Sequence, residues 1–558
     1  MVASNSHSTE GWLIRCLTHT ALIAAWVFAW FFRLGVRPLG EPDEGRYAEV
    51  AREMYVSGDL VTPRLDGFHF FDKPVLQYWA TTFFYALFGP HEWTSRLWPA
   101  LTALLAIVVA SWASGRLHGT RTAWTTALVL GSTFLFFSGA RTTTLDMGIA
   151  AFLSIAICLF MVAQFDPRAY RYQTLLNLLG WASIALAVLS KGLIGVVFPA
   201  LALCAFMIWE RSFKILGRLS LAPGLILFFA IAAPWFVVVC LRHPDFFEYF
   251  FIREHFGRFL TASDNRDHQL WYFTVVVFAG LFPWVVFIPL TRSDWRSLLS
   301  AGKEERFLLC WIIVIFVFFS VSKSKLPYYI LPIFPALAML IGHRISTLSG
   351  RSLGWRLVAI GVTAIVCSII LFHYQASVRH LAQHLDLHPL LVRLGHAFLL
   401  IAIAALFATT AVIYQRRQAA IFILGFATLL SWQSVYTTTN VVAEQLSARP
   451  AAQLMLPFVK ADTEVFTVHA YSRGLSFYLG RLVTVVDEDP ADILPGVASR
   501  PEGYVPDIGE FERRWKASSS AVALVDNSLM QRFSTDALPV TVVGNAPDGV
   551  VIRRTTTP

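Results

Sequence analysis

Two carboxylates are placed where they could take part in catalysis. Asp43 lies in EPDEGRYAE, just before a stretch with helical periodicity, and Asp146 lies in RTTTLDMGIA, at the start of a long apolar run. Either side chain could instead cap a helix, a role that Asp fills well. Placing a carboxylate at the centre of a membrane span costs about 2.5 to 3.5 kcal/mol. A carboxylate at the end of the span avoids this cost. Each of the two residues could therefore be either a helix cap or a catalytic carboxylate.

A group of Lys and Arg residues near the ends of apolar runs is the second set that could do chemistry. Arg forks and Lys ammonium groups are ordinary ligands for phosphate. Any single member could be salt-bridged or could extend toward the membrane surface, but the group as a whole predicts an anion site. Its members are Arg46, Arg52, Arg64, Lys73, Arg141, Lys191, Arg253, Arg258, Lys323 and Lys325.

The composition indicates that a lipid bilayer surrounds most of the chain. Of 558 residues, 56% are hydrophobic and only 15% are charged, whereas soluble proteins carry about 25% charged residues. The net charge of +9 arises in residues 1–437, because residues 438–558 are slightly acidic. A basic excess confined to the hydrophobic part favours membrane topology over a nucleic-acid partner. The six cysteines form no CxxC pair, which argues against a disulfide framework and a thiolate metal site.

Apolar runs of the length needed to cross a membrane, about 17 to 25 residues, give the organisation of the chain. The first run has no small-residue cleavage site, so it predicts a retained span and not a secretory signal. Fourteen runs are candidates, near 17–35, 74–90, 97–114, 123–140, 145–163, 175–190, 193–209, 219–241, 271–290, 307–321, 327–342, 356–373, 396–414 and 419–437.

The positive-inside rule selects among these runs. If residues 74–90 do not cross, the short basic loops all fall on one side of the membrane, for example those with Arg116 and Arg121 or with Arg416 and Arg417. The sequence therefore predicts thirteen spans, with the amino terminus in the cytoplasm and the carboxyl terminus outside. Residues 74–90 are expected to form a re-entrant or interfacial helix.

Three segments on the outer side are longer than simple turns. The first covers about residues 36–96 and contains a predicted amphipathic helix at 44–58, typical of a helix at the membrane interface. The second covers about 242–270 and includes DFFEYFFIREHFGRFL. The third is a predicted soluble α/β domain at 438–558. Its expected strands are 464–468, 482–486, 521–525 and 540–543. The fold class is thus a polytopic all-α membrane protein with a carboxyl-terminal α/β domain.

This topology brings Asp43, Asp146 and the basic group to one face of the membrane, which favours a phosphate-handling site there. A divalent ion could also be assembled on this side, although no spacing is diagnostic, and no cofactor is predicted as required. Asp487-Glu488-Asp489 contains an acidic DxD pattern, but a solvated turn is the favoured interpretation. Lys191-Gly192 is interpreted as a hairpin between spans. The possible metal ligands are His69, His91, His255, His268, Glu44, Asp72 and Glu254.

Three motifs resemble the polyprenyl-phosphate-dependent glycosyltransferases of the GT-C fold. They are PDEGRYAE at 42–49, FDKPVLQYW at 71–79 and SKLPYYILPIFPALA at 324–338. Within that class the whole chain is similar to the lipid A aminoarabinose transferases. These move 4-amino-4-deoxy-L-arabinose from undecaprenyl phosphate to lipid A, a modification that gives resistance to cationic antimicrobial peptides. The resemblance implies a lipid-linked sugar donor, a lipid A acceptor and a place in the bacterial inner membrane, with the site facing the periplasm.

Carried over by position, the resemblance implies a role for each matched residue. Asp43 and Asp146 would be the acidic residues of the site, and Lys73 and Arg258 would hold the donor phosphate. This chain has Val75 where the family often has a second proline, a change expected to affect the helix start more than the chemistry. Arg46 and Tyr47 would line the same cavity, and Lys325 and Tyr328 would face it.

The implied reaction is a single displacement with inversion. Two alternatives stay open. One is a related transferase that acts on a protein or glycan hydroxyl, in which Asp43 would serve as general base. The other is a flippase or transporter for a lipid-linked sugar. Transporters carry ionisable residues near the middle of the membrane, whereas the charges here gather at one face, so an enzyme is favoured.

Overall fold

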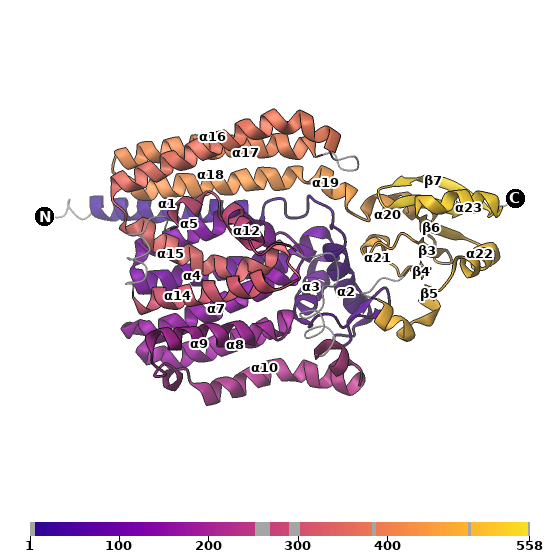
Figure 1. Cartoon of the computed structure of the whole chain (residues 1–558), viewed down its shortest axis with the longest axis horizontal. Coiled ribbons are helices and arrows are strands. Elements are labelled where there is room, and N and C mark those ends of the chain that lie inside the picture. Colours follow the sequence, from indigo (N-terminus) through magenta and orange to yellow (C-terminus); the bar gives the residue numbers. More distant parts are fainter. Residues whose placement is uncertain (1–5, 252–267, 289–301, 382–386, 489–492, 556–558) are drawn as a thin grey trace.

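The computed structural model describes residues 6–251, 268–288, 302–381, 387–488 and 493–555. Figure 1 shows a bundle of roughly parallel helices with a smaller α/β domain, formed by the carboxyl-terminal residues, at one end. The short elements α2 and α3 lie at the junction between the two parts. This junction contains most of the residues that the sequence singles out.

Long apolar helices form the bundle. An α-helix satisfies its backbone hydrogen bonds internally, which a segment surrounded by lipid requires. Large apolar side chains such as Val362, Leu406 and Phe407 lie exposed on the outer surface, as expected for contact with lipid. The described bundle helices are α1 (Ser6–Phe31), α4 (Glu92–His118), α5 (Thr120–Ser132), α6 (Phe134–Gly139), α7 (Leu145–Phe165), α8 (Gln173–Lys191), α9 (Ile194–Glu210), α10 (Leu221–Arg242), α12 (Tyr272–Leu281), α14 (Lys303–Val321), α15 (Phe334–Thr347), α16 (Gly350–Leu381), α17 (His388–Ile413) and α18 (Arg417–Thr438).

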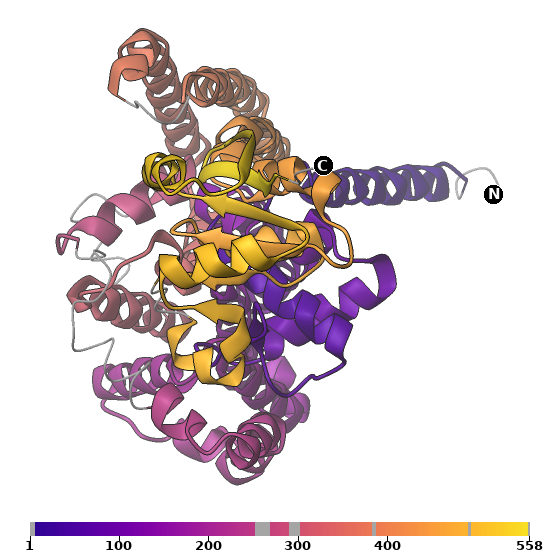
Figure 2. The same cartoon turned by 90° about the vertical axis from the view of Figure 1, so that its right-hand side faces the viewer.

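Eight segments of the described chain are long and apolar enough to cross a membrane. Shorter apolar helices add Thr20–Phe31, Ile194–Glu210 and Tyr272–Leu281, so the count of thirteen spans stays a prediction. Figure 2 shows that α1 leaves the bundle toward its amino-terminal end. The eight segments are Glu92–His118, Leu145–Phe165, Pro167–Lys191, Leu221–Arg242, Pro327–Thr347, Gly350–Tyr374, His388–Ile413 and Arg417–Gln445.

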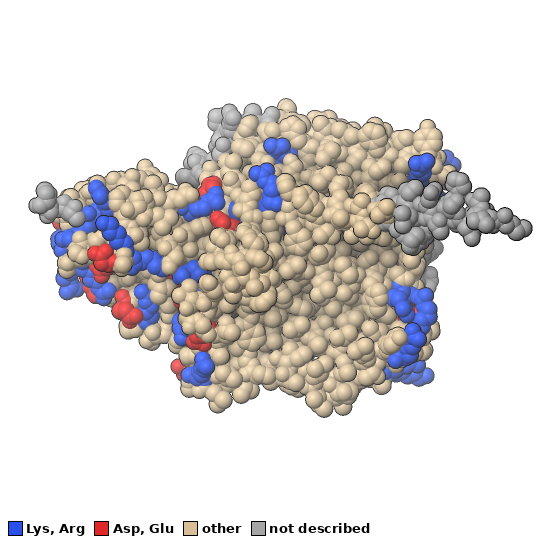
Figure 3. All heavy atoms as spheres, turned by 180° about the vertical axis from the view of Figure 1, so that it is seen from behind, with Lys and Arg blue, Asp and Glu red and all other residues tan. Residues whose placement is uncertain are grey.

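The surface charge follows the same division. In Figure 3 a broad band of the bundle shows hardly any Lys, Arg, Asp or Glu, and Lys and Arg gather at the end of the bundle far from the carboxyl-terminal domain. The domain itself displays both signs of charge. An apolar band bordered by charge is the surface that a bilayer covers.

The predicted outer segment 36–96 folds into two helices and a small hairpin. Helix α2 (Asp43–Ser57) ends at Gly58, whose φ of 71° is the left-handed conformation that glycine adopts easily. Strands β1 (Arg64–Leu65) and β2 (Phe68–His69) pair antiparallel. Helix α3 (Leu76–Phe88) has 13 residues and is therefore about 20 Å long. It is shorter than a hydrocarbon core of about 30 Å, which agrees with the expectation that this run does not cross.

The carboxyl-terminal domain contains one six-stranded sheet in the order β5-β4-β3-β6-β8-β7. The pairs β5–β4, β4–β3 and β3–β6 are parallel, and β8 pairs antiparallel with β6 and β7. The strands are β3 (Glu464–Val468), β4 (Thr484–Val486), β5 (Tyr504–Val505), β6 (Ala521–Val525), β7 (Val540–Ala546) and β8 (Gly549–Arg554). The helices are α19 (Asn440–Gln445), α20 (Arg449–Met455), α21 (Leu475–Leu479), α22 (Ile508–Ala517) and α23 (Met530–Thr535).

Protein, and not solvent, covers the polar side of α2. The amphipathic pattern at 44–58 predicts a polar face that carries Glu49, Arg52 and Glu53, but in the structure all three are buried. Arg52 donates two hydrogen bonds of 2.6 Å to Glu49, and Glu53 accepts from the backbone N–H of Gly67 at 3.0 and 3.1 Å. Part of the reason is that Gly45, four residues before Glu49 and on the same side of α2, lies against the backbone of Gly474 in the carboxyl-terminal domain.

One hydrophobic core joins α2 to the carboxyl-terminal domain. Val50 and Met54 belong to the same buried cluster as Leu475 and Val483. Beside this cluster, the carboxylate of Asp66 accepts hydrogen bonds from the hydroxyl groups of Tyr471, at 2.7 Å, and Ser476. The domain is therefore part of the structure that positions α2.

Candidate active site

Asp43 is the first residue of α2, and it is not the cap of that helix. The N-cap position belongs to Pro42, and no side chain caps the helix. Asp43 Oδ1 instead accepts from Arg46 Nη2 at 2.9 Å, and the Asp43 side chain is 41% exposed. The interpretation of Asp43 as a cap is thus wrong, and an accessible carboxylate with a cationic partner stands at the start of the helix.

Asp146 is likewise not a cap. Thr144 occupies the N-cap of α7 and no side chain caps that helix. Asp146 accepts a hydrogen bond from Lys191 Nζ at the end of α8, and Lys191 Nζ lies 4.3 Å from the centre of the Tyr329 ring. The two charged side chains are 13% and 15% exposed. The cost of an isolated charge in an apolar region explains why they are paired.

A cavity of about 90 Å³ opens beside this ion pair. Tyr328, which the sequence predicts as a site residue, lines it together with both charged side chains, and Tyr328 Oη lies 3.3 Å from Thr142 Oγ1. The volume corresponds to about three waters. Its lining residues are Asp146, Ile149, Lys191, Ile194, Phe198, Phe319, Tyr328, Tyr329 and Pro332.

Tyr47 connects the two carboxylates. Burial and then the charge of Asp43 raise the pKa of the Tyr47 hydroxyl, and Asp146 contributes in the same direction. Tyr47 is therefore within electrostatic range of both. The Arg46 guanidinium lies 5.5 Å from the centre of the Tyr47 ring, and the ring of Tyr78 lies 6.2 Å from it. That Asp43, Arg46 and Tyr47 share one site with Asp146 stays a prediction.

Two further predicted cations contact backbone oxygens close to this site. Lys73 Nζ donates to the carbonyl oxygen of Asp72 at 2.8 Å, and the Asp72 carboxylate accepts from the Tyr249 hydroxyl at 2.6 Å. Lys325, whose side chain is buried, donates to the carbonyl oxygen of His268 at 2.8 Å. These bonds show where the ammonium groups lie, while a role for either in phosphate binding stays a prediction.

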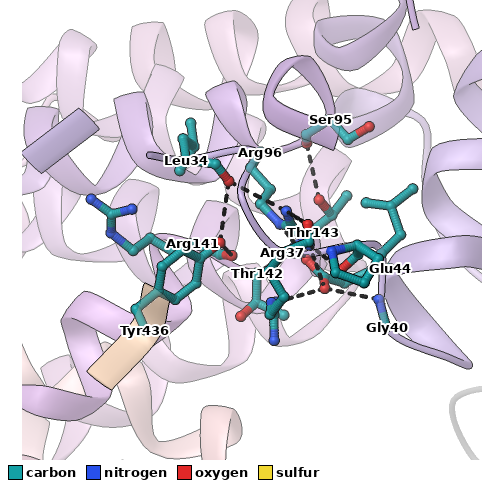
Figure 4. A network of polar contacts seen from close by, with 12 residues as sticks. Leu34, Arg37, Gly40, Glu44, Ser95, Arg96, Arg141, Thr142, Thr143 and Tyr436 are labelled. Atoms are coloured by element: carbon teal, nitrogen blue, oxygen red, sulfur yellow. Dashed lines mark hydrogen bonds and ion pairs between the residues drawn. The ribbon is translucent and has the colours of Figure 1, made fainter. Parts of the chain in front are cut away.

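Glu44, beside Asp43, is held by a buried ionic network (Figure 4). Its carboxylate accepts from Arg37 at 2.6 Å and from Arg96 at 2.8 and 2.9 Å. The backbone N–H groups of Gly40, at 3.1 Å, and Thr143, at 3.0 Å, complete its partners. Burial alone would raise the pKa of Glu44, but the two guanidinium groups hold that pKa at about 2.

The Glu44 network fixes the start of α2 relative to α4 and to the segment before α7. Arg96 lies in α4, and its remaining N–H groups donate to the carbonyl oxygens of Leu34, Arg37 and Pro38. Because Asp43 is the neighbouring residue, the network also fixes the backbone that carries that carboxylate. A carboxylate with so many donors is a poor metal ligand, so the expectation that Glu44 contributes to a metal site is wrong.

The other expected metal ligands on this side do not gather. His69 packs against His243 with ring centres 4.5 Å apart, His91 occupies the N-cap of α4, and His268 stacks on Tyr272. Within the described residues, none of them belongs to a group of three candidate ligands. His255 and Glu254 lie outside the described residues.

Several members of the predicted cation group have structural roles. Arg52 pairs with Glu49, and Arg64 with Asp59 at 3.0 Å. Arg141 is buried and donates to the carbonyl oxygens of Phe32, Ala29 and Trp30. The expectation that these three bind an anion is not supported by these contacts. Arg253 and Arg258, the latter predicted to hold the donor phosphate, lie outside the described residues.

The acidic pattern at 487–489 also has structural contacts. His469 Nε2 lies 2.9 Å from Asp487 Oδ2, and the Glu488 carboxylate accepts from the backbone N–H of Tyr471 at 2.8 Å. Asp487 is 38% exposed, which agrees with the favoured interpretation of a solvated turn. Asp489 lies outside the described residues.

Sequence reasoning did not assign two residues that belong to this site. Lys191 appeared only as a hairpin residue and a member of the cation group, although it is the partner of Asp146. Tyr78 is fully buried, and its hydroxyl has no hydrogen-bond partner among the described residues. Lys191 lies at the end of an apolar run, far from any predicted cytoplasmic loop, and this position could have identified it as a site residue. No feature of the sequence distinguishes Tyr78 from a core tyrosine.

Comparison with known protein families gives two matches along the chain. The family described as "Aminoarabinose transferase C-terminal domain" matches residues 451–554. The family described as "Dolichyl-phosphate-mannose-protein mannosyltransferase" matches residues 15–250. The first match coincides with the α/β domain, and the second covers α1 to α10 with Asp43 and Asp146.

Curated relatives cover a shorter part of the chain. The undecaprenyl phosphate-alpha-4-amino-4-deoxy-L-arabinose arabinosyl transferase of Erwinia tasmaniensis is 33% identical over 337 residues, which are 58% of this chain and 59% of the relative. The enzyme of the same name from Aeromonas hydrophila is 31% identical over 64% of this chain and 65% of the relative. The chain spans about three fifths of the length of the curated relatives that it matches.

A solved structure matches nearly the whole chain. The crystal structure of ArnT from Cupriavidus metallidurans bound to undecaprenyl phosphate superposes with a TM-score of 0.90 at 29% identity and covers 98% of both chains. The oligosaccharyltransferase of Archaeoglobus fulgidus, at 13% identity and a TM-score of 0.52, shares the fold alone. Together with the apolar helices, the first likeness makes the chain a multi-pass membrane protein.

Proposed function

We propose, on the premise that the chain belongs to the aminoarabinose transferase family of GT-C glycosyltransferases, that it transfers 4-amino-4-deoxy-L-arabinose from undecaprenyl phosphate to a phosphate of lipid A. The observation that carries this proposal is the pairing of Asp43 with Arg46, whose guanidinium lies over the Tyr47 ring, and of Asp146 with Lys191 beside the cavity that Tyr328 lines. Carboxylates and cations are concentrated there at the end of the bundle that bears the α/β domain.

The donor makes cations the first requirement of such a site. The sugar is bonded to a lipid phosphate, so the bond from the anomeric carbon to the phosphate oxygen breaks with its electron pair on that oxygen. The leaving group is an anion and needs positive charge more than it needs a proton. Lys73 and Lys325 are the described cations proposed to supply it, and Arg258 joins them by family position.

The acceptor makes a strong general base unnecessary. A phosphate monoester has a second pKa of about 6, so its oxygen is largely ionised at neutral pH. That oxygen attacks the anomeric carbon from the face opposite the leaving phosphate, which inverts the configuration. Asp43, 41% exposed, orients the acceptor or the cationic amino group of the sugar and stabilises the positive charge that develops on the anomeric carbon.

Asp146 and Lys191 are proposed to fix the inner wall of the site. Their ion pair lines the cavity together with Tyr328 and Tyr329, and both charges lie within range of α2. A paired, largely buried Lys keeps its charge without reaching the solvent. It therefore orients Asp146 and raises the positive potential of the cavity.

The proposed location is the bacterial inner membrane with this site and the α/β domain on the periplasmic side. The support is the positive-inside pattern of the loops and the gathering of Lys and Arg at the opposite end of the bundle in Figure 3. The lipid-linked donor would reach the site from the outer leaflet.

The second candidate is a transferase that acts on a protein or glycan hydroxyl. The match of residues 15–250 to a protein mannosyltransferase family favours this alternative. A hydroxyl acceptor must lose a proton, so Asp43 would then act as general base. The two candidates differ in acceptor and in pH profile, but they use the same donor chemistry.

Reconstitution with defined lipids tests the proposal. The purified full chain in liposomes that contain undecaprenyl-phosphate-linked aminoarabinose should modify added lipid A, and Asp43→Asn and Lys73→Ala should abolish transfer. Asp245→Asn and Lys516→Ala, at exposed positions outside the predicted cation group, should retain it as matched controls. Full activity in either site variant removes that residue from the mechanism. Transfer to a peptide or glycan, with none to lipid A, supports the second candidate.

A further inference from the structure

Three potential metal ligands meet at the end of the bundle away from the candidate active site. His118 is in the last turn of α4, Glu305 in the first turn of α14, and His343 in α15. One ligand atom from each lies within 4.8 Å of the others, and within the described chain no other such group of three occurs. Residues far apart in the sequence thus bring two imidazoles and a carboxylate together.

The cluster is far from the candidate active site. The first residue of α4, Glu92, contacts Arg449 of the carboxyl-terminal domain at 3.3 Å, whereas His118 is in the last turn of the same 27-residue helix. At about 1.5 Å per residue the two ends are about 40 Å apart. A ligand held by His118 would therefore occupy a site separate from Asp43.

Contacts within the cluster leave two ligand atoms without partners. Glu305 Oε2 and His343 Nδ1 are buried and have no hydrogen-bond partner among the described residues. Leaving a buried polar atom unpaired costs about 1 to 3 kcal/mol. Two such atoms in a cluster of three side chains indicate that a partner completes the site.

An ion pair between Glu305 and a protonated His343 does not account for these atoms. His343 Nε2 and Glu305 Oε1 are 3.6 Å apart, which is too long for a hydrogen bond. The rings of His118 and His343 lie with centres 4.1 Å apart, so charging both would add repulsion. Neutral imidazoles beside a carboxylate are, in contrast, the form in which these side chains bind metal.

The ligand types point to zinc. Two histidine nitrogens and one carboxylate oxygen with an open fourth position are a common set for Zn²⁺, with bonds of about 2.0 to 2.2 Å. Tetrahedral ligands at that distance are about 3.4 Å apart, so separations of up to 4.8 Å need to shrink by about 1.4 Å at most. Side-chain rotation supplies such a change. Glu305 is 10% and His343 34% exposed at the side chain, which leaves a route for an ion and for a water ligand.

We propose that His118, Glu305 and His343 bind a divalent transition-metal ion, with Zn²⁺ preferred, and that the ion ties together the ends of α4, α14 and α15. The other end of α14 leads to Lys325, and α15 follows the turn that carries Tyr328 and Tyr329. The ion would therefore stabilise helices whose far ends border the candidate active site. This inference holds whichever acceptor the transferase uses.

Metal analysis of the purified full chain tests the site. After treatment with a chelator and addition of zinc, the unaltered chain should retain one more equivalent of zinc than His343→Ala or Glu305→Gln. Glu304→Gln, on the next residue of α14, and His396→Ala, on exposed α17, should retain the same amount as the unaltered chain. Removal of a supporting residue around a metal weakens binding by about 10- to 100-fold, so loss of a direct ligand should weaken zinc binding at least about 100-fold.

Two readouts make the test decisive. Cobalt substituted for zinc should give visible absorption bands that His343→Ala and Glu305→Gln both lack, and elution of each variant as an unaggregated protein checks its fold. Glu305→Gln replaces one carboxylate oxygen by an NH2 group and keeps the shape of the side chain. It therefore provides the test if His343→Ala does not fold. Equal zinc content in all variants, or no zinc binding by the unaltered chain, overturns the proposal.

Discussion

Removing the carboxylate of Glu44 should strongly destabilise the protein. The variant Glu44→Ala leaves the guanidinium of Arg96, which is 0% exposed, without its anionic partner. Breaking a buried ion pair from one side costs about 3 to 5 kcal/mol, because the remaining charge is neither paired nor hydrated. The carbonyl oxygens that Arg96 also contacts offset only part of this cost.

The pKa of Glu44 gives an independent magnitude. It lies at about 2, compared with 4.5 for an ordinary Glu. A difference of about 2.5 pH units at about 1.36 kcal/mol per unit corresponds to about 3 kcal/mol. A lowered carboxyl pKa stabilises the fold above 4.5 and loses that effect as the pH falls through 2. The full contribution is therefore present at neutral pH, where the variant should be measured.

A double-mutant cycle in detergent micelles measures the interaction. We expect Glu44→Ala to lower the free energy of unfolding by about 3 to 5 kcal/mol, and Glu44→Ala with Arg96→Met to recover much of it, since apolar replacement of both partners is often nearly neutral. Unfolding by SDS can be followed by tryptophan fluorescence. Asp536→Ala, in an exposed pair with Arg532, is the control and should change stability by about 0.5 kcal/mol. A loss below 1 kcal/mol for Glu44→Ala, or no recovery in the double variant, would refute this reasoning.

Three further predictions concern the site, the domain contact and the topology. Lys191→Met removes the cationic partner of Asp146 and the positive charge of the cavity, so transfer should fall, and full transfer by this variant would contradict a role for the pair. Burial and then the charge of Asp66 raise the pKa of Glu53 to about 7. The free energy of unfolding should therefore decrease as the pH rises from 4.5 through 7, by up to about 1.4 kcal/mol per pH unit. The unfolding midpoint of Glu53→Gln should vary less between pH 5.5 and 8, and an equal pH dependence of both midpoints would contradict the raised pKa. A cysteine at Val56, 68% exposed, in a chain without native cysteines should react with an impermeant thiol reagent added outside cells; labelling only after lysis would overturn the orientation.

Local sequence patterns were sufficient to predict most elements of the fold. Apolar runs of span length became helices because a chain in lipid has to satisfy its backbone internally. The β-branched runs at 464–468 and 521–525 became β3 and β6 with the same bounds. The sequence did not predict β5 and β8. Strand β5 has only two residues, and β8 begins at Gly549, directly after a turn at 547–548, and contains two arginines.

Long-range contacts explain what the sequence could not predict. The polar side of α2 has the pattern of a solvated face, but partners more than 400 residues away, such as Ser476 beside Asp66, cover that region. Asp43 and Asp146 lie in the first turns of helices, close to where caps stand, yet each has a cationic partner instead. Which positive residue belongs to which carboxylate depends on how the helices pack, and packing cannot be read from spacing along one chain.

Mass spectrometry of lipid A tests the central claim most directly. Lipid A should be isolated from otherwise identical cells that lack the gene, express it unaltered, or express Asp43→Asn at the same protein level. The account predicts a pentosamine-sized mass increase on a lipid A phosphate with the unaltered chain alone. No increase with the unaltered chain, or an equal increase with Asp43→Asn, would contradict it.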